Sequence, residues 1–196
     1  MSPEPRQLAG GEMPVSNEDN VLTYRMAAIL YEDGPSFDGF MQEFANELRI
    51  KGHVLSGVIQ INQDRQNSRH CDMLLEDLAT GRTVVISEDR GGEARGCRLN
   101  VAALLEAGMT IRQSLSEKTD LLLINKFGKM ESEGGGLRDL IVEASLSGVP
   151  VLVGVPVRNK QAWQEFCGTE ADLLAQDPEQ IKKWTAGALS MRPARL

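Results

Sequence analysis

The chain has 196 residues, of which 41% are hydrophobic and 25% charged, a composition of globular rather than fibrous or disordered proteins. Its formal net charge of −7 argues against binding of DNA or RNA by general phosphate neutralisation. The longest apolar stretches are far shorter than the roughly 20 residues that span a bilayer, so no membrane helix is expected. Residues 1–22 lack the apolar core of a signal peptide, and we expect a disordered arm there, followed by a single cytoplasmic domain over residues 23–196.

Apolar runs alternate with an amphipathic segment in the first part of this domain. Residues 26–31 predict a buried strand, and residues 54–60 predict a second one. The segment between them has the apolar spacing of a helix, carried by Phe37, Phe40, Met41, Phe44, Ala45 and Leu48. We expect Phe40 and Phe44 to lie in the core. A strand, helix and strand in this order are typical of a parallel crossover.

The remaining residues predict one hairpin and further alternation of helices and strands. Residues 73–78 and 82–86 flank a compact turn, which predicts an antiparallel hairpin within residues 71–87. Later patterns predict helices at 99–117, between Gly136 and Gly148, at 159–167 and at 178–189, and strands at 121–125 and 151–155. The alternation predicts a three-layer α/β fold with a mainly parallel sheet.

Ligands of open parallel sheets bind where the loops follow the carboxyl ends of the strands. In this chain those loops are expected at 32–36, 60–70, 88–98, 125–136 and 156–159. The first contains Gly34-Pro-Ser-Phe-Asp-Gly39, with the glycine spacing of a phosphate-binding loop, but Phe40 and Met41 stand at the lysine and hydroxyl positions. Triphosphate hydrolysis needs a cation there. Either Gly34 and Pro35 simply open a helix, or Gly34, Pro35 and Ser36 form a residual anion site at its start.

The strand at 121–125 ends in an amide, Asn125, and is followed by an ammonium group, Lys126. Asn125 and Lys126 would make a poor Mg²⁺ site, because that ion prefers anionic oxygen ligands. They could instead receive an anion, with Asn125 and Gln60 orienting it, although Lys126 could also be an ordinary solvated residue. We find no nucleophile motif, so no catalytic residue is expected.

Arginine is concentrated between residues 65 and 98, where six arginines occur without a lysine. Guanidinium groups suit forked hydrogen bonds to an oxyanion, and Arg90, Arg95 and Arg98 lie in a glycine-rich loop. Six acidic residues balance them, so surface ion pairs are the alternative. Cys97 lies between these cations, which would lower its pKa, and we include it in the candidate site. A soft-metal site of Cys71 and Cys97 is less well supported, because their spacing is not that of a zinc site.

Taken in order, several segments over residues 25–156 resemble the small nucleoside-triphosphatase family of P-loop proteins. They are Ile29 to Ser36, Gly52 to Ile59, the hairpin, and Leu122 to Glu131. The resemblance implies a P-loop NTPase-like fold, but that family has an intact phosphate loop and an acidic pair where this chain has Asn125 and Lys126.

Other segments look more like a bacterial domain family of uncharacterised function, whose members are often encoded beside molybdate-transport genes. These segments are Cys71 to Met73, Arg90 to Leu99, Asn125 to Glu131 and the later Gly-Gly-Leu-Arg138. The resemblance implies a role near molybdate or tungstate. We therefore expect a degenerate P-loop protein that binds a small oxyanion without hydrolysis and acts as a binding or regulatory module.

Two other functions remain open. One is a nucleoside triphosphatase, or a nucleotide-binding protein, with an unconventional phosphate site. The other is an interaction scaffold with a vestigial pocket, which works through a homodimer or another protein partner.

Overall fold

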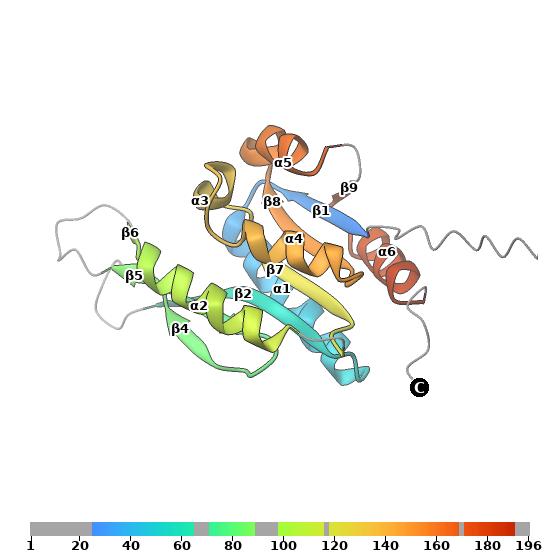
Figure 1. Cartoon of the computed structure of the whole chain (residues 1–196), viewed down its shortest axis with the longest axis horizontal. Helices are drawn as coiled ribbons and strands as arrows, with labels where there is room; N and C mark the ends of the chain where they lie inside the picture. The colour runs from blue at the N-terminus through green and yellow to red at the C-terminus, as the bar shows by residue number, and fades with distance from the viewer. Residues whose placement is uncertain (1–24, 65–70, 89–97, 116–117, 169–170, 191–196) are drawn as a thin grey trace, which may run out of the picture.

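A seven-stranded sheet lies at the centre of the computed structural model, which describes residues 25–64, 71–88, 98–115, 118–168 and 171–190 (Figure 1). In spatial order its strands are β4 (Thr83–Val85), β3 (Cys71–Asp77), β2 (Leu55–Asp64), β7 (Leu121–Asn125), β8 (Val151–Pro156), β1 (Met26–Tyr31) and β9 (Ala171–Ala175). Five neighbouring strands run parallel to one another, namely β2, β7, β8, β1 and β9. The other two, β3 and β4, each pair antiparallel with their neighbours. The predicted α/β architecture with an antiparallel hairpin is confirmed.

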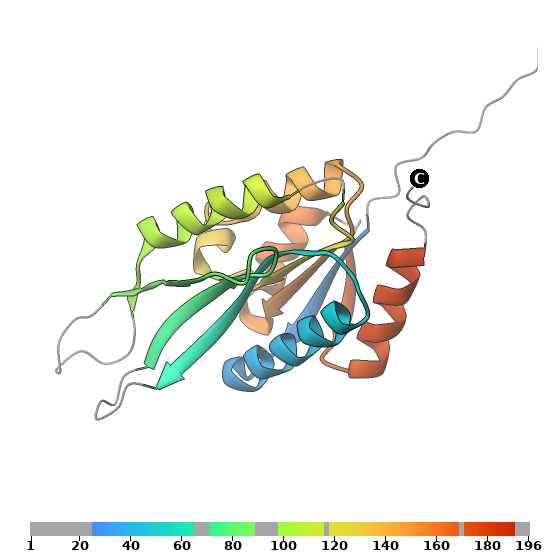
Figure 2. The same ribbon diagram turned by 90° about the horizontal axis from the view of Figure 1, so that it is seen from below.

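Helices cover both faces of the sheet, which gives the three layers visible in Figure 2. On one face lie α1 (Gly34–Ile50) and α6 (Pro178–Ser190), and on the other lie α2 (Val101–Ser114), α4 (Arg138–Leu146) and α5 (Lys160–Cys167). The shorter elements are α3 (Lys129–Ser132), the 3₁₀ turn η1 (Val157–Asn159) and the strand pair β5 (Ser87–Glu88) and β6 (Arg98–Leu99). None of the helices in the described ranges has the length and apolarity that crossing a membrane requires.

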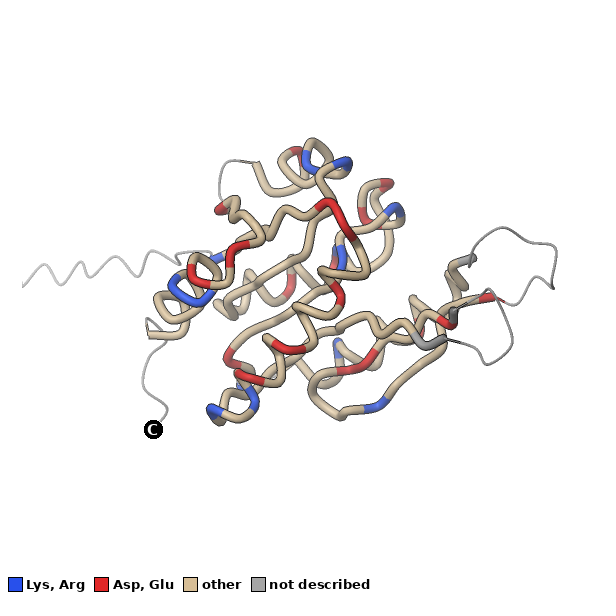
Figure 3. The backbone as a smooth tube through the Cα atoms, turned by 180° about the vertical axis from the view of Figure 1, so that it is seen from behind, with Lys and Arg blue, Asp and Glu red and all other residues tan. Residues whose placement is uncertain are grey.

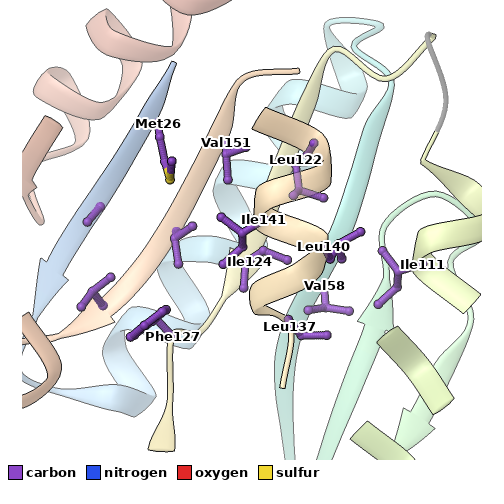
Figure 4. Packing of buried hydrophobic residues seen from close by; sticks show 14 of the residues in the cluster. Met26, Val58, Ile111, Leu122, Ile124, Phe127, Leu137, Leu140, Ile141 and Val151 are labelled. Carbon is purple, nitrogen blue, oxygen red and sulfur yellow. The ribbon is translucent and has the colours of Figure 1, made fainter. Parts of the chain in front are cut away.

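The two cores follow from the alternation of side chains along buried strands. In β7, Leu121 and Leu123 face α1, whereas Leu122 and Ile124 face the opposite layer. Figure 4 shows Leu140 and Ile141 of α4 packed over this second face of β7. Since both faces of β7 are covered, its residues 121–124 are all apolar, as is typical of a central parallel strand.

The structure departs from the sequence-based predictions at the edges of the elements. Strand β2 continues to Asp64, beyond the predicted end at residue 60, because it pairs with β3 over this polar stretch. The edge strand β9 was not predicted, since its apolar run at 173–175 is short and Leu174 is its one buried residue. Phe44 is buried as expected, but Phe40 is only half-buried, which corrects its placement in the core.

Candidate functional site

Helix α1 begins at Gly34, so the segment with the glycine spacing of a phosphate loop is helical from its first residue. Pro35 lies in the first turn, and the side chain of Asp33 accepts a hydrogen bond from the Ser36 amide at 3.3 Å. Gly34 and Pro35 therefore open a helix, which is the simpler of the two interpretations of this sequence. A carboxylate of the chain itself already uses one of the N–H groups that a bound anion would need.

Phe37 fills the space between the start of α1 and the end of β8. Its ring is fully buried and stacks on Tyr31 with 3.9 Å between the ring centroids. On the other side it contacts Gly154, where a Cβ atom would lie 2.2 Å from the ring. The close approach of this aromatic side chain leaves little room between α1 and β8.

Asp38, the next residue in α1, is buried and joins a cluster of amide side chains, in which Gln60 and Asn125 are buried and Asn62 is exposed. Its Oδ1 accepts a hydrogen bond from Asn125 Nδ2 at 2.9 Å, and its Oδ2 accepts one from Asn62 Nδ2 at 2.7 Å and a longer one from Gln60 Nε2 at 3.4 Å. Because β2 continues past the end of β7, side chains from both strands reach Asp38. With Asp38 6% exposed, these donors compensate for the burial of its carboxyl group.

Tyr31 lies at the edge of this cluster, at the end of β1. Burial, and secondarily the nearby charge of Asp38, raises the pKa of its phenol well above the ordinary value. The hydroxyl group therefore stays neutral and protonated at physiological pH.

A cavity of about 220 Å³ opens beside the cluster, on the α2 side of the sheet. Its polar end includes Gln60, Asn125, Lys126, Lys129, Glu131 and Arg158. Its apolar wall includes Val58, Leu75, Ile86, Leu104, Met130 and Leu137. The loops after β7 and β8 thus supply most of the polar groups, as expected for a parallel sheet.

Positive charge predominates at the polar end of the cavity, where three cations and one carboxylate line it. Within the described ranges, neither Lys126 nor Arg158 forms an ion pair, and Lys129 has only an exposed partner, Glu133, at 3.7 Å. In the described part of the chain, basic and acidic positions are otherwise interspersed along the backbone (Figure 3). The lining cations are therefore available to an anion.

Glu131 shapes the segment that carries Lys126 and Lys129. Its side chain, 3% exposed, accepts hydrogen bonds from the Gly128 amide at 2.8 Å and from the Leu137 amide at 3.0 Å. The two carboxylate oxygens thus accept hydrogen bonds from opposite ends of the segment between β7 and α4 and hold its conformation. The one carboxylate that lines the cavity is already satisfied by backbone donors.

We expect Glu131→Gln to lower the free energy of unfolding by about 1–3 kcal/mol, since the amide nitrogen of glutamine would face a backbone N–H group. Urea unfolding of the variant measures this loss. The matched control is Glu133→Gln in the same segment, where an exposed ion pair predicts a change below about 0.5 kcal/mol. Equal stability of both variants would contradict the assigned role of Glu131.

The structure brings together three of the predicted site residues, Gln60, Asn125 and Lys126, around the cavity. The predicted Gly34, Pro35 and Ser36 lie at the start of α1. Arg90, Arg95 and Cys97 lie outside the described residues, and only the backbone positions of Arg98 and Cys71 are described. Leu99, which follows Arg98 in β6, lines the cavity.

The sequence reasoning missed four polar residues of this region, which are Asp38, Asn62, Lys129 and Arg158. Lys129 and Arg158 lie in the segments after β7 and β8, which the rule on strand ends marks as ligand-binding loops without indicating which of their residues face a ligand. Asp38 gave no such signal, because a single polar residue beside an apolar helical stripe is usually solvent-exposed.

Potential metal ligands do not cluster in the described part of the chain, where no group of three or more His, Cys, Asp and Glu side chains could hold an ion. Cys167 is a free thiol that contacts Met26, and burial raises its pKa to about 12. It therefore stays protonated at physiological pH and is a poor metal ligand.

A crystal structure of THEP1 from the hyperthermophile Aquifex aeolicus is similar to this fold, with a TM-score of 0.57 over 85% of this chain and 98% of that one. The two sequences are 17% identical, so the likeness concerns the fold alone. The predicted P-loop NTPase-like fold is confirmed.

In sequence, the chain is 34% identical over 160 residues to a protein of Bradyrhizobium diazoefficiens named "Molybdenum import ATP-binding protein ModC 2". The match takes in 82% of this chain but only 18% of the length of that relative. The model of a family described as "Protein of unknown function (DUF2478)" matches residues 26–184. Since these residues make up most of the chain and include all seven strands of the sheet, the chain belongs to this family.

Proposed function

We propose that the protein binds a small anion without hydrolysing a nucleotide, and that molybdate and tungstate are its leading candidate ligands. The start of α1 carries this proposal. A hydrolytic phosphate loop needs a flexible glycine-rich turn and a lysine, whereas this segment is helical, with Phe37 and Asp38 packed against the ends of β8 and β7.

The positive charge that a phosphate-binding loop carries on its lysine lies on other loops in this protein. Lys126, Lys129 and Arg158 surround the polar end of the cavity, and Asn125 and Gln60 lie among them. Ammonium and guanidinium groups form charge-assisted hydrogen bonds to oxyanions without a metal ion. Arg90, Arg95 and Arg98, with Cys97 among them, are proposed to complete the site from the arginine-rich sequence that precedes Leu99.

Molybdate and tungstate are proposed because the relative is named as a molybdenum import protein. Because the chain spans only a small part of that relative, we do not assign the relative's transport activity to this protein. The chemistry of the site supports molybdate and tungstate as ligands, since a tetrahedral dianion suits several converging cationic donors.

Calorimetric titration with molybdate, tungstate, sulfate and phosphate tests this function. We expect binding of at least one of these anions, and a loss of affinity of about tenfold or more in Lys126→Ala, because a hydrogen bond to a charged group is removed. Lys183→Ala, an exposed lysine of α6 on the other face of the sheet, is the matched control and should bind normally. Absence of heat with all four anions, or unchanged binding in Lys126→Ala, would end the proposal.

Nucleotide binding is the second candidate, favoured by the P-loop NTPase-like fold and by the ATP-binding name of the relative. An assay of phosphate release from ATP and GTP separates the two functions. We expect no release above the rate of the buffer. Turnover that is abolished by Lys126→Ala would instead establish a nucleoside triphosphatase with an unconventional cation.

A further inference from the structure

We propose that the same site also takes an organic anion, with a ring that occupies the apolar part of the cavity and an acidic group that lies at the cationic end proposed for molybdate and tungstate. The inference rests on the proposed function, because it concerns the same site. It adds the chemical class of the ligand, a ring with a phosphate or carboxylate substituent.

The apolar wall is the first observation. Val58, Leu75, Ile86 and Leu104 come from β2, β3, the segment after β4, and α2, and all four are buried side chains of the core on this face. A tetrahedral oxyanion has no apolar surface to place against them. A ring would bury apolar area there, which favours binding.

The size of the cavity is the second observation. An apolar cavity of about 150 Å³ in another protein holds a benzene ring. The volume here, about 220 Å³, therefore has room for one ring together with a substituent that reaches Lys126, Lys129 and Arg158. A bare oxyanion would leave the apolar end unfilled.

Titration with inorganic phosphate, phenyl phosphate and phenol tests the inference. We expect phenyl phosphate to bind at least about tenfold more tightly than inorganic phosphate, and more tightly than phenol, because it uses both ends of the cavity. Leu104→Phe should remove the advantage of phenyl phosphate over phosphate by filling the apolar end. Leu105→Phe, the adjacent exposed position of α2, is the control and should keep the advantage. If Leu104→Phe does not fold, as judged by circular dichroism, Met73→Phe on the opposite side of the cavity gives the same readout.

The outcomes of these titrations show whether the organic ligand or the anion site itself is wrong. Equal affinity for phosphate and phenyl phosphate, both weakened by Lys126→Ala, would overturn the organic ligand and keep the anion site. Equal affinity for phenol and phenyl phosphate, unaffected by Lys126→Ala, would overturn the anion site. Absence of binding by all three probes would overturn the inference.

Discussion

Replacing Gly57 by alanine is expected to abolish stable folding. Gly57 lies in β2 opposite Leu123 of β7 and has a φ of +104°, a backbone conformation that L-residues rarely adopt. A Cβ atom would lie 1.9 Å from the Leu123 carbonyl oxygen, which belongs to the central strand and cannot move without breaking the sheet. The backbone strain and the steric clash together predict a loss of more than about 3 kcal/mol. Urea unfolding, or the yield of folded protein, measures it.

The matched control for this substitution is Gly39→Ala. Gly39 lies within α1, and a Cβ atom there would meet nothing within 4 Å. Alanine is the better helix former, so we expect a gain of about 0.5–1 kcal/mol. If Gly57→Ala unfolded at the same urea concentration as the natural chain, the pairing of β2 with β7 would be wrong.

We expect Phe44→Ala to lower the free energy of unfolding by about 3–5 kcal/mol. Phe44 is 4% exposed and lies in the core between α1 and the sheet, so its removal loses buried apolar surface and leaves a cavity. Thermal or urea unfolding checks this loss. Phe40→Ala is the natural comparison, since this neighbour stacks on Phe44 but is only half-buried, and its removal should cost less. A cost for Phe44→Ala below that of Phe40→Ala would mean that α1 packs on the sheet by a different face.

The candidate site could be predicted in part, because the rule on strand ends depends only on the order of the elements. Gln60, Asn125 and Lys126 follow from that rule once the strands are located, and all three line one cavity, while their binding of a ligand stays a prediction. Lys129 and Arg158 follow from the same rule but were missed, because the sequence does not indicate which loop residues face inward.

Asp38 shows the limit of pattern reasoning. In sequence it stands among apolar residues that predict a helix, and nothing marks it as buried. Its carboxyl group is held by Asn62 and Asn125, which are distant in the chain. Asn125 ends β7, and Asn62 reaches Asp38 from the part of β2 that extends beyond β7.

The sequence by itself determined the alternation of strands and helices, and with it the parallel sheet, because hydrophobic periodicity is a local property of the chain. It also excluded a standard phosphate loop, since the lysine that such a loop requires is absent. Only the tertiary structure decided that Phe37 and Asp38 pack against the ends of β8 and β7, and that three cations border an apolar cavity. These features depend on the register and relative length of neighbouring strands, which are set by contacts between residues far apart in the sequence.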